Sequence, residues 1–151
     1  VIDDVAYICC GDNNGTLVDD LWKFDGSDWK QLRDIANNDS DEDYDDDYAI
    51  TRAGTVSFVI DGRGYIATGT RSGVTSDYWV YDPEEDLWYG DSDDDYTPMT
   101  NVHNVSSGGS SRSYAVSFST GKRGFVLSGS SGTSYFDDVY ELLPYEQEDV
   151  D

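Results

Sequence analysis

Acidic side chains are the most abundant candidates for chemistry in this sequence of 151 residues. Of the 32 Asp and Glu residues, seven lie in 37–48, four in 91–96 and four in 146–151. The simplest interpretation is that these segments are hydrated and disordered, because like charges repel one another. A second interpretation is calcium binding, since Asp41, Asp43 and Asp45 alternate as oxygen ligands do. However, the fixed glycine and the distant bidentate Glu of a calcium loop are missing.

A third interpretation treats the acidic segments as a docking surface for a basic partner, with Tyr44, Tyr48 and Tyr96 as aromatic contacts. These alternatives remain open at the level of sequence. Other chemistry is scarce. His103 is the single histidine. Cys9 and Cys10 are neighbours that we expect to be free structural thiols, with a vicinal disulfide or a metal thiolate pair as the alternatives. We therefore predict no resident metal or cofactor, with Ca²⁺ kept only as the second interpretation.

The charge balance excludes several classes of partner. Nine Lys and Arg against 32 Asp and Glu give a net charge of −23, which opposes binding to nucleic acid and to anionic membranes. No apolar run has the roughly 20 residues that a membrane-spanning helix needs. The N-terminus VIDDVAYICC also lacks the basic start of a signal peptide.

The elements that position these residues repeat along the chain. RAGTVSFVIDGRGYIATG at 52–69 aligns with RSYAVSFSTGKRGFVLSG at 112–129, at an offset of 60. VIDDVAYICCG at 1–11 aligns with VIDGRGYIATG at 59–69, and DLWKFD at 20–25 aligns with DYWVYD at 77–82. The chain therefore contains three copies of one unit.

Each copy is predicted to form β-strands. In the second copy, apolar and polar residues alternate over 56–60, and turn residues 61–64 lead to a second run that ends at Gly69. Two further runs at 78–81 and from Leu87 complete four antiparallel strands. One such sheet has two faces to cover, so radial packing of several sheets in a β-propeller is the expected solution.

These residues also resemble a known family. Gly69, then Tyr81 followed by Asp82-Pro83, and Trp88 seven positions after the Tyr are similar to the kelch repeat of galactose-oxidase-like β-propellers. The resemblance implies an all-β fold of kelch-type blades with four antiparallel strands, here an incomplete ring of about three blades. It also implies ligand binding from the channel mouth, where kelch proteins grip acidic peptides.

The expected organisation follows from the copies. Residues 1–36 form blade 1 with a truncated first strand, 52–90 form blade 2, and 112–145 form blade 3 without an outer strand. The segments 37–51 and 91–111 are loops between blades, and 146–151 is an acidic tail. We expect the ring to be completed either by further blades of a longer chain or by self-association of two chains.

Candidate binding residues lie where strands meet loops. Arg52 and Arg112 open the innermost strand of two copies, where each guanidinium either caps backbone carbonyls or pairs with an Asp of a neighbouring blade, or else binds a ligand at the channel mouth. Asn13 and Asn14 in loop 12–18 and Arg71 in loop 70–76 fall on one rim, whereas Arg63, Lys122 and Arg123 would concentrate positive charge on the other. The predicted binding residues are Arg52, Arg112, Arg71, Asn13, Asn14, Tyr48 and Tyr96.

The sequence favours a non-catalytic scaffold that recognises a protein or peptide through the loops of one rim. No nucleophile elbow is present, and one histidine cannot supply the imidazoles of the copper site found in oxidases of the resembled superfamily. The alternative is a carbohydrate-binding module or an enzyme whose site lies on blades outside this chain, so an activity of a full-length parent stays open. The Asn-, Asp-, Ser- and Tyr-rich repeats resemble those of bacterial envelope proteins, which favours the cell envelope or secretion over the cytoplasm.

Overall fold

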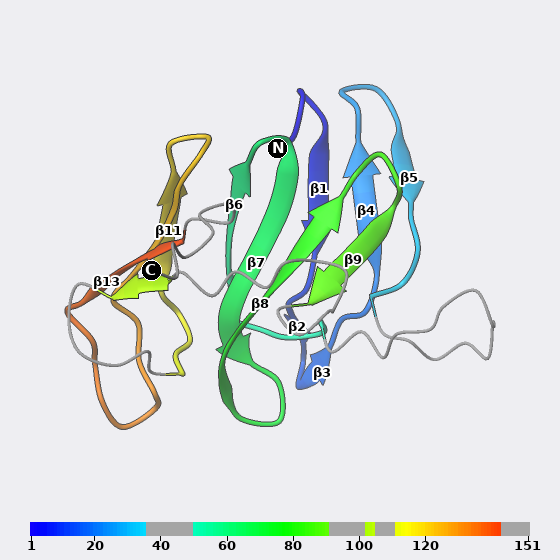
Figure 1. The fold of residues 1–151 in the computed structure, drawn as a ribbon. Helices are drawn as coiled ribbons and strands as arrows, with labels where there is room; N and C mark the ends of the chain where they lie inside the picture. Colours follow the sequence, from blue (N-terminus) through cyan, green and yellow to red (C-terminus); the bar gives the residue numbers. More distant parts are fainter. Residues whose placement is uncertain (36–49, 91–101, 105–110, 143–151) are drawn as a thin grey trace.

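The fold consists of antiparallel β-sheets. The computed structural model describes residues 1–35, 50–90, 102–104 and 111–142, and that part of the chain contains strands and turns but no helix (Figure 1). Consequently, none of the described residues belongs to a helix able to cross a membrane. The all-β prediction is confirmed, and its reason is visible in the sequence: β-branched and aromatic residues alternate with polar ones and are interrupted by Gly-rich turns.

The second copy forms a four-stranded sheet in sequence order. It contains β6 (Val56–Ile60), β7 (Arg63–Thr70), β8 (Val74–Asp82) and β9 (Leu87–Gly90). Each strand pairs with the next in antiparallel register, for example Phe58 opposite Tyr65 and Tyr81 opposite Trp88. This is the strand order that the sequence pattern of 52–90 predicts.

The first copy forms a three-stranded sheet. It contains β1 (Ala6–Cys9), β4 (Leu21–Phe24) and β5 (Trp29–Gln31), and a short ribbon of β2 (Asp12–Asn13) and β3 (Thr16–Leu17) projects between β1 and β4. No described strand occupies the position on the free edge of β1 that β6 occupies on β7. Only the bridge between Ile2 and Val5 remains of the expected first hairpin.

The third copy forms a four-stranded sheet that differs from the expected one at its outer edge. It contains β11 (Val116–Ser119), β12 (Gly124–Leu127) and β13 (Val139–Leu142), and β10 (Val102–Asn104) pairs with β13. The repeat predicts a loop over 91–111 and an empty outer position. Within the described residues no strand follows β13, but β10 supplies hydrogen-bonding groups to an edge that would otherwise be unpaired. His103 therefore lies in a strand.

The hydrophobic core lies between neighbouring sheets. One buried cluster joins the first and second copies, and its members are Ile2, Leu21, Ile35, Ile50, Ile66, Tyr81 and Trp88. The other joins the second and third copies, and its members are Val56, Phe58, Ile60, Tyr65, Ala67, Tyr78, Val80, Val126, Tyr140 and Leu142. Residues that alternate along the strands of the middle sheet thus pack against the first sheet and the third sheet in turn. The three sheets stack side by side (Figure 1).

A recurring backbone irregularity lies within β7 and directly after β1 and β12. Thr68, Ser128 and Cys10 adopt positive φ angles of 61°, 57° and 66°, and each precedes a glycine with positive φ. A Cβ on Gly69 would lie 2.8 Å from Ala53 O, and one on Gly129 would lie 2.9 Å from Ser113 O. Glycine is required at these two positions because the residues that lead into β6 and β11 approach so closely.

Candidate functional site

Arg52 is buried within the second copy, and its side chain holds the two ends of one loop together. The guanidinium is 0% exposed. It donates to Thr68 O at 3.0 Å, before the loop 70–76, and to both carboxylate oxygens of Asp77 at 2.9 and 2.8 Å, after the loop. Its Nε donates to Ile50 O at 2.9 Å. The bidentate pair and the carbonyl acceptors together satisfy the buried cation.

Arg112 repeats this arrangement in the third copy. It is 1% exposed, and it donates to Ser128 O at 2.8 Å and to the two oxygens of Asp138 at 2.5 and 3.0 Å. The guanidinium carbon also lies 4.5 Å from the ring centroids of Phe136 and Tyr140. These aromatic faces add cation–π attraction to the ion pair.

No described contact supports the predicted ligand-binding role of Arg52 and Arg112, which stays a prediction. Neither guanidinium reaches solvent, and each is held by the Asp of its own copy. Each guanidinium caps a backbone carbonyl, as one alternative from the sequence has it, but the Asp that it pairs with belongs to the same copy and not to a neighbouring blade. The two arginines instead fix the loops that follow β7 and β12.

The ion pairs make folding stability depend on acid. Hydrogen bonding to Arg112 lowers the pKa of Asp138 from its ordinary value of 3.8. Burial alone would raise the pKa of Asp77, but hydrogen bonds and the charge of Arg52 outweigh burial and lower it. A carboxyl group with a lowered pKa in the folded state stabilises the fold above its unfolded pKa, and that contribution disappears as the pH falls through the folded value.

We expect Asp138→Asn to be destabilised at neutral pH, and the difference from the unmodified chain to shrink as the pH falls below about 4. Urea unfolding between pH 7 and pH 2.5 measures this difference. Asp137→Asn, which changes the exposed neighbour, is the matched control and is expected to show no such convergence. A difference that stays constant to pH 2.5 would show that the ion pair does not stabilise the fold.

One end of the stacked sheets carries the loops that these arginines support. We call this end the loop rim, and it comprises the segments 12–18, 70–76 and 130–135, at the bottom of Figure 1. Asn13, Asn14 and Arg71 are exposed on it, as the sequence predicts. Asn14 has a φ of 58° and precedes Gly15 in the tight turn of the β2–β3 ribbon.

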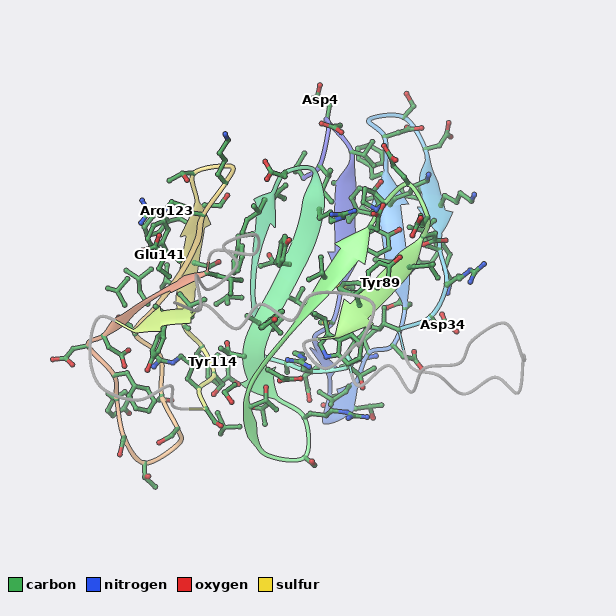
Figure 2. All side chains as sticks on the ribbon, in the orientation of Figure 1. Asp4, Asp34, Tyr89, Tyr114, Arg123 and Glu141 are labelled. Atoms are coloured by element: carbon green, nitrogen blue, oxygen red, sulfur yellow. The ribbon has the colours of Figure 1, made fainter. Side chains whose placement is uncertain are left out.

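Two tyrosines outside the predicted set also lie near the loop rim. Tyr135 is 91% exposed and Tyr114 is 77% exposed. The ring of Tyr114 covers Gly54, and its backbone N–H donates to Gly54 O at 2.8 Å (Figure 2). The Gly- and Ser-rich loop around Tyr135 is a signal in the sequence that this tyrosine is exposed. The alternation of apolar and polar residues does not distinguish it from the tyrosines of the core.

The opposite end, which we call the turn rim, contains the turns 61–62, 83–86 and 120–123. The three cations expected there lie on this rim, but two of them are paired with carboxylates. Arg63 Nε donates to Asp82 Oδ2 at 3.0 Å, and Arg123 pairs with Glu141 (Figure 2). A cavity of about 420 Å³ beside Arg63 is lined by Asp3, Asp61, Asp82 and Glu84. This rim is therefore acidic in character.

Cys9 and Cys10 are unlinked thiols at the end of β1. Cys10 Sγ contacts Ile50 O at 3.7 Å, and its backbone occupies the irregular position that Thr68 and Ser128 occupy in the other copies. A hydrogen bond to Cys10 and burial raise the pKa of Cys9, which keeps its thiol protonated. Within the described ranges, no three His, Cys, Asp or Glu side chains gather as metal ligands do.

Several predicted features lie outside the described residues. They are the acidic segment with Asp41, Asp43, Asp45 and Tyr48, the segment 91–96 with Tyr96, and the tail 146–151.

Comparison with known proteins does not assign this chain to a family. No family model matches the chain, and no curated protein is significantly similar to it.

Proposed function

We propose that this chain is part of a kelch-like β-propeller and that it acts as a non-catalytic scaffold for recognising a protein or peptide. The fold proposal is supported by the way the copies stack. At both interfaces, one face of a sheet packs against the opposite face of the next sheet. The arrangement of the first and second copies is therefore repeated by the second and third. Backbone bonds repeat as well, because Gly11 N donates to Arg52 O at 2.9 Å and Gly69 N to Arg112 O at 2.7 Å.

The loop rim is the surface that we propose to bind the partner. The observation that carries this proposal is that exposed side chains stand on loops whose bases are fixed by buried Arg–Asp pairs. Such a base lowers the entropy lost when a ligand is bound. Arg71 presents a cation on a chain of net charge −23, and Tyr135 presents an aromatic surface. The rim therefore suits a peptide with an acidic group beside an apolar one.

Selection from a displayed library of random peptides tests this proposal. We expect enrichment of peptides with an acidic residue near an aromatic or aliphatic one. Their affinity should fall at least about tenfold in Arg71→Ala and in Tyr135→Ala. Lys122→Ala, on the turn rim, is the control and should bind as the unmodified chain does.

Two results would contradict the proposal. Equal losses in Lys122→Ala would place the binding elsewhere, and failure to enrich any peptide would argue against peptide recognition. A parallel glycan array distinguishes the alternative class, because exposed tyrosines also stack on sugar rings. Binding of glycans that is lost in Tyr135→Ala, without peptide binding, would replace the peptide proposal by the carbohydrate-binding one.

A further inference from the structure

In the second and third copies, the first strand of the sheet makes several contacts with the second strand. The first copy has the residues of the second strand but no described partner for them. Phe58 stacks on Tyr65 with ring centroids 5.6 Å apart, and Phe118 stacks on Phe125 at 4.6 Å. Tyr7 is the counterpart of Tyr65, yet no described phenylalanine stacks on it, and its ring lies 5.4 Å from Tyr81 instead. A Cβ on Gly11 would meet nothing within 4 Å, whereas Gly69 and Gly129 are closely approached.

The first copy also has an aspartate at the position that pairs with arginine in the other two copies. Asp20 aligns with Asp77 and Asp138, and it accepts a hydrogen bond from Trp22 Nε1 at 2.6 Å, as Asp77 does from Trp79 at 3.3 Å. No guanidinium pairs with Asp20 among the described residues. Cys10 O takes the place of Thr68 O and Ser128 O, the carbonyls that accept from Arg52 and Arg112.

A cavity lies where the first strand of this copy would be. Its volume is about 310 Å³, and it runs between the free edge of β1 and the face of β6 and β7. Tyr7, Cys9, Ser57 and Gly64 are among its lining residues. At the equivalent place in the next interface, Ser117 Oγ donates to Ser57 O at 2.8 Å and the Phe58 ring covers Gly124. In the first interface Gly64 has no such ring over it, since only Ile2 Cδ1 and Tyr81 Cβ lie within 4 Å of a Cβ placed on Gly64.

We propose that this groove binds an extended peptide segment in which arginine is followed six positions later by phenylalanine. The segment pairs antiparallel with β1 and adds a strand to the sheet. Its arginine forms a bidentate pair with Asp20 and donates to Cys10 O, and its phenylalanine stacks on Tyr7 and lies over Gly64. Unpaired backbone groups on the edge of β1 supply the remaining hydrogen bonds.

Residues 1–151 of a second copy of this chain are not the source of the segment. This chain has the Arg-x5-Phe spacing at Arg52 to Phe58 and at Arg112 to Phe118. Both arginines are buried in ion pairs of their own copies, so neither is available to a second molecule. This inference concerns the edge of β1 and does not depend on peptide recognition at the loop rim.

A blocked peptide with the sequence of residues 50–58, ITRAGTVSF, is the probe, titrated into the full chain by calorimetry. We expect saturable binding of one peptide per chain. Replacing its arginine by glutamine, or its phenylalanine by alanine, should weaken binding at least about tenfold. Hydrogen exchange should show new protection in residues 7–11, at the edge of β1.

Asp20→Asn separates this role from general destabilisation. The variant keeps an acceptor for Trp22, and it should bind the arginine peptide about as weakly as the unmodified chain binds the glutamine peptide, with no further loss when both changes are combined. Asp19→Asn is the matched control and should leave binding unchanged. Absence of saturable binding, protection at another edge, or dimerisation of the chain through β1 would each overturn the proposal.

Discussion

Replacing Arg52 by methionine is expected to destabilise the chain by about 3–5 kcal/mol. The variant removes the guanidinium donors to Ile50 O, Thr68 O and Asp77, and it leaves the half-buried Asp77 carboxylate without its cation. Such a loss is a large share of the roughly 5–15 kcal/mol that stabilises an ordinary domain. Urea unfolding, followed by tryptophan fluorescence, measures the change in the unfolding free energy.

Two comparisons make the result specific to the ion pair. Arg71→Met removes an exposed arginine nearby and should change stability by no more than about 0.5 kcal/mol. Adding Asp77→Asn to Arg52→Met should cost less than it costs alone, because the carboxylate has already lost its cation. Additive losses, or a loss below about 1 kcal/mol for Arg52→Met, would refute the structural role of the pair.

Gly124→Ala is expected to destabilise the chain by about 1–3 kcal/mol, whereas Gly64→Ala at the equivalent position should be tolerated. A Cβ on Gly124 would lie only 2.3 Å from Phe58 Cε2, and Phe58 is itself buried. At Gly64 the nearest atom is Ile2 Cδ1 at 3.3 Å, the end of a flexible side chain. Neither glycine has a positive φ, so steric overlap alone separates the two variants.

Thermal and urea unfolding of the two alanine variants measures this difference. Phe58→Leu, added to Gly124→Ala, should recover part of the loss because the smaller side chain leaves room for the methyl group. Equal stability of Gly124→Ala and Gly64→Ala would show that the second and third copies do not pack as described. The comparison also tests whether the groove of the first copy lacks an aromatic ring over Gly64.

The repeat makes most strands and their order predictable from the residues alone. Alternation over 56–60, the turn at 61–64 and the recurring Gly69 are local signals, and hydrogen bonding within one sheet follows from them. β10 is not predictable in this way. Its pairing with β13 depends on an edge that is unpaired only once the third sheet has formed, and nothing within 102–104 carries that information.

The same distinction between local and long-range signals applies to the candidate site residues. Loop residues such as Asn13, Asn14 and Arg71 are exposed because Gly, Ser and Asn favour turns, which the sequence indicates directly. The burial of Arg52 and Arg112 depends on an Asp 25 or 26 residues away and on carbonyls of the adjacent strand. The residues next to each arginine in the sequence do not indicate that these acceptors surround it, so its burial does not follow from the sequence.

Strand alternation and turn chemistry act over a few neighbouring residues, so the amino-acid sequence alone predicts antiparallel sheets in three similar copies. The packing of the sheets sets which side chains face solvent, which arginines pair internally, and which residues border the groove beside Asp20 and Tyr7. Those outcomes depend on contacts between sheets, and burial and ion pairing are properties of that packing rather than of any local stretch of residues.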